Sequence, residues 1–214
     1  MLDALMCSLY ELAVRSSKES DEDKTLGGHQ FEERVARLIY AHEKIEGLKA
    51  QQPRLTLQLP TISGLAYQFD ASFSFRDALF VIECKKRRSL LTGSELVHYF
   101  SSKILDYVLA SERAGRPMKI RGIFLSTQDT GESGTIYGLS FGVKVIDPSH
   151  PPVPYMLSTL SQEENALRQS LVELDEKMTL DFTRHAGNSP SKVYEQYQFL
   201  RKRWKGVVGS SPNI

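Results

Sequence analysis

This 214-residue chain has few cysteines and histidines, the residues that form disulfides or bind structural metal ions. Its two cysteines, Cys7 and Cys84, lie far apart and lack the close spacing of a metal-binding pair. Its five histidines also show no ligand spacing. A disulfide scaffold and a zinc module are therefore not expected. Both thiols are instead expected to be buried and free, as in a reducing cytoplasm.

The chain also lacks an excess of charge of either sign, because its net charge is +1 at pH 7. No global field draws it to nucleic acid, so any such contact needs a local basic surface. No apolar run is long enough to span a membrane, and the N-terminus, with Asp3, lacks the basic start of a signal peptide. We therefore expect a cytoplasmic protein without a membrane segment, with one sizeable core and an appendage.

The most informative stretch, residues 67–88, predicts two strands joined by a turn. Residues 78–82 form a continuous apolar run, which is typical of a strand covered on both faces. Glu83, Cys84 and Lys85 follow this run. Because strand side chains alternate, Glu83 and Lys85 are expected on one face and Cys84 on the other.

The first of these strands is expected to have a polar and an apolar side. The apolar positions are Phe69, Ala71, Phe73 and Phe75, and the polar ones are Asp70, Ser72 and Ser74. If the turn near Arg76-Asp77 forms a hairpin, Asp70 lies beside Glu83. Two carboxylates there repel each other unless a cation lies between them, and hard oxygen ligands suit Mg²⁺ or Mn²⁺. The alternative is an exposed ion pair between Glu83 and Lys85, of little energetic value.

An acidic residue also borders the apolar stripe of a predicted helix at residues 28–39. The stripe consists of Phe31, Val35, Leu38 and Ile39. Glu32 lies at its edge, where a carboxylate needs a partner unless it still reaches water. The helix pattern alone does not decide whether the carboxylate of Glu32 has a partner or reaches water.

Taken in order, these residues resemble the PD-(D/E)XK nuclease superfamily, also called the restriction-endonuclease-like fold. The resemblance rests on Phe31-Glu32, Asp70 and Glu83-Cys84-Lys85, and is closest to the Mrr-type restriction endonuclease branch. It covers residues 28–148 and implies a strand over 64–70, before the lysine. After the lysine it implies a helix over 94–114, a strand over 119–127, a helix over 132–140 and a strand over 143–148.

The resemblance implies an α/β fold, with a central mixed sheet flanked by helices and a C-terminal helical extension. It also implies a site in which Asp70, Glu83 and the carbonyl of Cys84 bind Mg²⁺, for which Mn²⁺ can substitute. Lys85 would position the attacking water, and Glu32 would hold a water or a second ion. The basic residues beside this site are expected to contact DNA phosphates, and these are Lys86, Arg87 and Arg88.

Three parts are expected along the chain: an N-terminal helix and charged linker at 1–24, the nuclease-like core at 25–148, and a helical extension and tail at 149–214. The proline-rich residues 148–154 predict a break, and helices are predicted over 161–182 and 191–205. The first and last helices each carry an apolar stripe, formed by Leu5, Met6, Leu9 and Leu12 and by Val193, Tyr197, Leu200 and Trp204. Each stripe either packs within the chain or binds a second copy or a partner protein.

The leading interpretation is therefore an Mg²⁺-dependent endodeoxyribonuclease acting in restriction or phage defence. One alternative is a non-catalytic DNA-binding or scaffolding subunit with the same fold. Another is a repair or junction-resolving nuclease.

Overall fold

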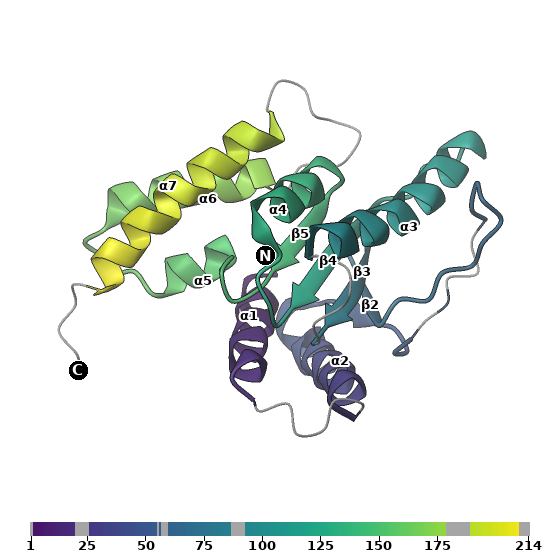
Figure 1. Cartoon of the computed structure of the whole chain (residues 1–214), viewed down its shortest axis with the longest axis horizontal. Helices are drawn as coiled ribbons and strands as arrows, with labels where there is room; N and C mark the ends of the chain where they lie inside the picture. Colours follow the sequence, from purple (N-terminus) through teal and green to yellow (C-terminus); the bar gives the residue numbers. More distant parts are fainter. Residues whose placement is uncertain are drawn as a thin grey trace.

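A mixed five-stranded sheet forms the centre of the computed structural model, in the order β1-β2-β3-β4-β5 (Figure 1). The structure describes residues 2–19, 26–54, 56, 60–86, 93–178 and 189–209. The strands are β1 (Lys49–Ala50), β2 (Ala71–Phe75), β3 (Ala78–Lys85), β4 (Ile120–Ser126) and β5 (Val143–Ile146). The first three pair antiparallel, whereas β3, β4 and β5 pair parallel.

The described residues form seven helices, and they cover both faces of the sheet (Figure 1). Two precede the hairpin of β2 and β3: α1 (Asp3–Ser17) and α2 (Leu26–Glu46). The next two are α3 (Gly93–Arg113) and α4 (Gly131–Ser140), and the last three are α5 (Val153–Ser158), α6 (Asn165–Met178) and α7 (Pro190–Gly209). The expected α/β fold, with a mixed sheet flanked by helices and a C-terminal helical extension, is thus confirmed.

Apolar side chains are buried on both faces of β3. On one face, Phe80 and Ile82 pack in a cluster with residues of α1 and α2, such as Leu9 and Val35. On the other face, Val81 packs in a cluster with residues of α3. A strand covered on both faces has no side that needs polar residues, which explains the continuous apolar run that predicted it.

The hairpin between β2 and β3 is confirmed, because Phe75 pairs with Ala78 across a two-residue turn. The expected strand over 64–70 is wrong, since β2 begins only at Ala71. Phe69 packs in the cluster on the α3 face, whereas Ala71 lies in the cluster on the α1 and α2 face. The backbone bends between them, at Asp70, so the alternation expected from Phe69 onward is broken there.

The C-terminal helices have an apolar cluster of their own, which includes Met156 of α5, Leu171 of α6 and Tyr197 of α7. The break expected over 148–154 is wrong at its end, because α5 already begins at Val153. Pro154 lies in the first turn of α5, where a helix needs no N–H donor. The helix expected over 161–182 begins only at Asn165, and residues 179–182 lie outside the described part.

Both apolar stripes that were considered as partner surfaces pack inside the chain. Leu5, Met6 and Leu9 of α1 are buried in the same cluster as strand residues of the sheet. The stripe of α7 is likewise buried, with Tyr197 at 1% and Leu200 at 3% exposure. A second copy or a partner protein would therefore contact other surfaces. Among the described helices, none has the length and apolar character needed to cross a membrane.

Candidate functional site

Strand β3 brings Glu83 and Lys85 to the same face of the sheet, as the alternation predicts. Cys84 is buried in the cluster on the opposite face. Glu83 is itself buried, and its Oε1 accepts a hydrogen bond of 2.7 Å from the Nζ of Lys85. Burial works to lower the pKa of Lys85, but the charge and hydrogen bond of Glu83, together with the charge of Asp70, outweigh burial and raise this pKa. The pair is thus partly buried and tightly bound, unlike the solvated ion pair that was the alternative.

A second lysine, Lys103 of α3, holds the other oxygen of Glu83. Its Nζ lies 3.1 Å from Oε2 of Glu83, and its side chain is 14% exposed. Sequence analysis did not identify this residue. The available signal was its position three residues after Phe100 and four before Tyr107, at the edge of the buried stripe of α3. Glu83 is therefore neutralised by cations from two different elements.

Asp70 lies at the entrance of β2 and faces the end of β3. Asp70 comes directly before Ala71, which pairs with Ile82, and its backbone N–H donates a 3.1 Å hydrogen bond to the carbonyl of Ile82. Oδ2 of Asp70 accepts a 2.7 Å hydrogen bond from the backbone N–H of Cys84. Burial and then the charge of Glu83 raise the pKa of Asp70 from 3.8 to about 6. The two acids are thus close enough for the charge of Glu83 to change the pKa of Asp70.

Glu32 of α2 borders this site but is bound to an arginine. Its Oε2 accepts hydrogen bonds of 3.0 Å and 3.1 Å from the guanidinium of Arg54, and its side chain is 20% exposed. Arg54 also donates its backbone N–H to the carbonyl of Asp70 and has a positive φ of 55°. Arg54 was not identified from the sequence. It connects Glu32 to Asp70, whose pKa the charge of Glu32 helps to raise.

The predicted DNA-contacting residues are only partly described. Arg87 and Arg88 lie outside the described residues. Lys86 is described, and its Nζ forms a 2.7 Å ion pair with Glu19, which also binds Arg34. Its side chain is 15% exposed, so a phosphate would have to compete with Glu19 for this ammonium.

The arrangement of Asp70, Glu83 and Cys84 fits a divalent cation. The N–H and C=O of one strand residue point to the same side, so the carbonyl of Cys84 is directed toward Asp70. The charge of the buried Glu83 raises the pKa of the half-buried Asp70, and a bound cation would relieve this repulsion. Lys85 and Lys103 hold both oxygens of Glu83, however. A cation bound by Glu83 would therefore replace at least one lysine contact.

The tightest group of possible metal ligands in the described part of the chain lies elsewhere, at Asp129, Asp147 and His150. Asp147 is fully buried and accepts hydrogen bonds from the backbone and hydroxyl of Thr130 and from the ring of His150. Burial works to raise the pKa of Asp147, but these hydrogen bonds outweigh it and lower the pKa. His150 also contacts the hydroxyl of Tyr194 on α7 at 3.1 Å. Both carboxylate oxygens of Asp147 accept hydrogen bonds. Through His150, Asp147 therefore acts as a structural contact between the end of β5 and the C-terminal helices.

No protein-family model matches the chain, and no curated protein matches it. Among solved structures, it is similar to the small subunit of a heterodimeric restriction endonuclease, with 15% identity and a TM-score of 0.47 over 92% of this chain and 98% of that one. It is also similar to a protein of unknown function, with 17% identity and a TM-score of 0.44 over 83% and 98% of the two chains. Both likenesses are distant, so neither assigns a family or an activity to this chain.

Proposed function

We propose that the chain is a metal-dependent endonuclease that hydrolyses DNA at a site formed by Asp70, Glu83 and Lys85. The observation that carries this proposal is the placement of Asp70, buried Glu83 and Lys85 together at the end of β3, where burial and the charge of Glu83 raise the pKa of Asp70. Acids held where their repulsion opposes folding are typical of functional sites. A lysine on the same face adds the cation that phosphodiester cleavage needs.

Each residue has a distinct role in this proposal. Asp70, Glu83 and the carbonyl of Cys84 would hold Mg²⁺ or Mn²⁺, which when bound neutralises phosphate charge and acidifies water. Lys85 orients the attacking water and stabilises the negative charge that develops on the phosphate. Lys103 balances the charge of Glu83 from the α3 side.

Glu32 and Arg54 lie beside the proposed metal-binding residues and support them. Their ion pair sets the position of Arg54, whose backbone binds the carbonyl of Asp70. The negative charge of Glu32 adds to the field that a cation at Asp70 would experience. In this proposal Lys86, Arg87 and Arg88 contact the DNA backbone beside the site, and Lys86 exchanges Glu19 for a phosphate.

A cleavage assay tests the proposal. Plasmid, linear duplex, single-stranded DNA and RNA are each incubated with the pure chain, with Mg²⁺, with Mn²⁺ or with a chelator. We expect metal-dependent cleavage of DNA that Asp70→Asn and Lys85→Ala abolish. Asp77→Asn is the matched control, because Asp77 is exposed in the turn at the other end of β3. Cleavage that survives the chelator, or that Asp70→Asn leaves unchanged, would contradict the proposal.

One observation favours the second candidate, a non-catalytic DNA-binding or scaffolding subunit. Both oxygens of Glu83 bind lysines, and Glu32 binds Arg54, so the site neutralises its own acids. A chain that binds DNA in a gel-shift assay, but cleaves no substrate with any metal, would support this candidate. Equal DNA binding by wild type and Asp70→Asn would then complete the case.

The biological role within the nuclease class is a further part of the proposal. For restriction or phage defence in the cytoplasm, we expect cleavage of duplex plasmid that depends on sequence or base modification. For repair, we expect a preference for four-way junctions or flaps in the same panel. A second copy or a partner protein would supply the second active site for cutting both strands, and light scattering with and without DNA measures this assembly.

A further inference from the structure

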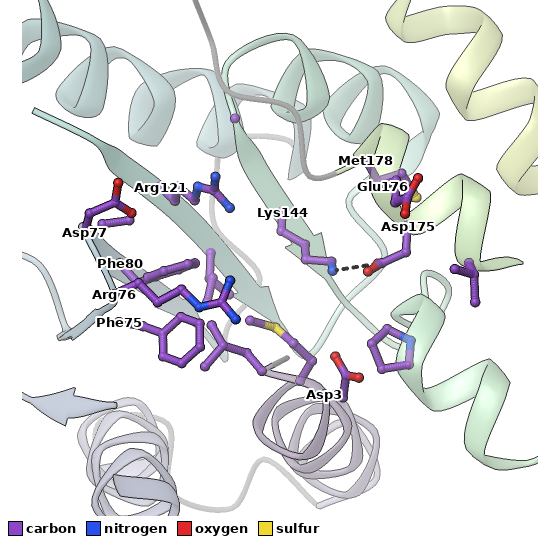
Figure 2. A pocket seen from close by; sticks show the side chains of 18 of the residues that line it. Asp3, Phe75, Arg76, Asp77, Phe80, Arg121, Lys144, Asp175, Glu176 and Met178 are labelled. Atoms are coloured by element: carbon purple, nitrogen blue, oxygen red, sulfur yellow. Dashed lines mark hydrogen bonds and ion pairs between the residues drawn. The ribbon is translucent and has the colours of Figure 1, made fainter. Parts of the chain in front are cut away.

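A cavity of about 610 Å³ lies at the opposite end of β3 from Glu83 (Figure 2). The turn between β2 and β3 and the first residues of β4 and β5 form one wall. Residues of α1, α5 and α6 form the other. This volume is within the usual range for pockets that bind small molecules. The cavity also lies between the sheet and the C-terminal helices, where binding sites often occur.

Two arginines on the sheet side of the cavity are each placed over an aromatic ring. The guanidinium carbon of Arg76 lies 5.2 Å from the ring centre of Phe75, and that of Arg121 lies 5.9 Å from that of Phe80. Figure 2 shows both arginine side chains beside the cavity, from the turn and from β4. Contact with a ring restricts where a guanidinium lies, and its fork of N–H donors matches the oxygens of a phosphate.

Arg76 holds this position in a strained backbone conformation. It lies in the two-residue turn between Phe75 and Ala78, and its φ is +54°. A side chain disfavours this region by about 1–2 kcal/mol, whereas glycine adopts it freely. Strained residues gather at ligand-binding sites, because the surrounding structure imposes the strain in return for placing a side chain. The two-residue turn itself calls for a positive φ at its first position, and it places the side chain of Arg76 beside the cavity.

The opposite wall carries acids. Asp3 comes from α1, and Asp175 and Glu176 come from α6. Asp175 forms an ion pair of 3.4 Å with Lys144 of β5. Carboxylates on this wall suit hydroxyl and amino groups, which donate hydrogen bonds, and they repel a phosphate. The sheet side also carries an acid, Asp77 in the turn, which pairs with Lys119. An anion would therefore contact the two arginines, and a hydrogen-bond donor the carboxylates of the opposite wall.

An apolar surface lines the rest of the cavity, with Met6, Leu157 and Val172 among its residues. It suits a flat ring system. A phosphate, a set of hydroxyl and amino donors and a flat ring occur together in a nucleotide. We propose that this cavity binds a nucleoside monophosphate, with the phosphate on Arg76 and Arg121 and the sugar and base toward the acids.

Calorimetry on the full chain tests this proposal with the four nucleoside monophosphates, adenosine and orthophosphate as probes. We expect at least one monophosphate to bind at least about 10-fold more tightly than orthophosphate or adenosine, because both halves of the cavity contribute. Orthophosphate binding as tightly as every monophosphate would overturn the assignment of a nucleotide. So would the absence of binding by all four at millimolar concentration.

Substitutions then locate the site. Arg76→Gly removes the guanidinium and also relieves the strain, so its melting temperature should match or exceed that of wild type. It should nevertheless weaken nucleotide binding about 10-fold or more, as should Arg121→Gln. Arg113→Gln, at the exposed end of α3, is the control and should bind as wild type does. Wild-type affinity in Arg76→Gly would overturn the proposal. Asp70→Asn should also bind normally, which separates this site from the nuclease site.

Discussion

The backbone N–H of Cys84 donates a 2.7 Å hydrogen bond to Oδ2 of Asp70. This contact holds the carboxylate of Asp70 against β3, the strand that carries Glu83. The hydrogen bond favours the charged form of Asp70, yet burial and the charge of Glu83 prevail and raise its pKa. Three testable consequences concern the acids and lysines of this site, and two concern contacts around it.

The first prediction concerns the stability of the metal-free chain. The pKa of Asp70 rises from 3.8 to about 6 on folding, so the folded chain keeps a proton that the unfolded chain releases between these values. The stabilisation is fully present below the unfolded pKa and is lost as pH rises through about 6, and the shift corresponds to about 3 kcal/mol. Asp70→Asn keeps an acceptor for Cys84 without the charge. It should therefore be more stable than wild type at about pH 8.

Urea denaturation across the pH range measures this effect. The difference in unfolding free energy between Asp70→Asn and wild type should grow as pH rises through about 6. Asp77→Asn, in the exposed turn, should show no such rise. A constant difference at every pH would mean that Asp70 is not the titrating group.

The second prediction concerns metal binding. Mn²⁺ should bind wild type in calorimetry and fail to bind Asp70→Asn, because an amide lacks the charge that holds the cation. The affinity of wild type should also fall below about pH 6, where a proton competes for the carboxylate of Asp70. Equal Mn²⁺ binding by the two proteins would remove Asp70 from the site.

The third prediction separates the two lysines that hold Glu83. Lys85→Ala should lower the cleavage rate about 100- to 1000-fold while metal affinity stays equal or rises, because loss of a cation does not weaken a metal site. Lys103→Met should raise Mn²⁺ affinity, since it frees Oε2 of Glu83. Its effect on cleavage should be smaller than that of Lys85→Ala. Unchanged turnover in Lys85→Ala would exclude the role of Lys85 in catalysis.

The fourth prediction concerns the strained arginine at the site. Arg54→Ala and Arg54→Gly both remove the two N–H donors that contact Oε2 of Glu32, which should destabilise the chain by about 1–3 kcal/mol. Arg54 has a positive φ of 55°, which glycine adopts and alanine resists. The alanine variant should therefore be less stable than the glycine variant, by about 1 kcal/mol. Equal stability of the two in urea would show that the backbone of residue 54 relaxes.

The fifth prediction concerns the junction between the sheet and the C-terminal helices. Tyr194→Phe removes the hydroxyl that contacts Nε2 of His150 in a buried position. The unpaired ring nitrogen should lower the unfolding free energy by about 1–3 kcal/mol. Tyr40→Phe is the matched control, because the hydroxyl of Tyr40 is exposed and makes only a long contact with a backbone carbonyl. A similar small effect of both substitutions would mean that water replaces the lost partner.

Several features of the fold could be predicted because the patterns that specify them are local. The apolar run of residues 78–82 identified β3, and the 3.6-residue repeat of Phe31 and Val35 identified α2. The hairpin register also followed from the sequence, because a two-residue turn sets the pairing from Phe75 with Ala78 to Ala71 with Ile82.

The sequence by itself thus determined the hairpin, the face that Glu83 shares with Lys85, and the helices that carry regular apolar stripes. Only the tertiary structure decided which cations neutralise the acids. Lys103 is 20 residues from Glu83 and Arg54 is 22 from Glu32, and each pair meets through the packing of separate elements. The bend at Asp70 likewise moved Phe69 to the α3 face, against the alternation. Periodicity acts between near neighbours in the chain, whereas the partner of a buried charge depends on which elements pack together and in what orientation.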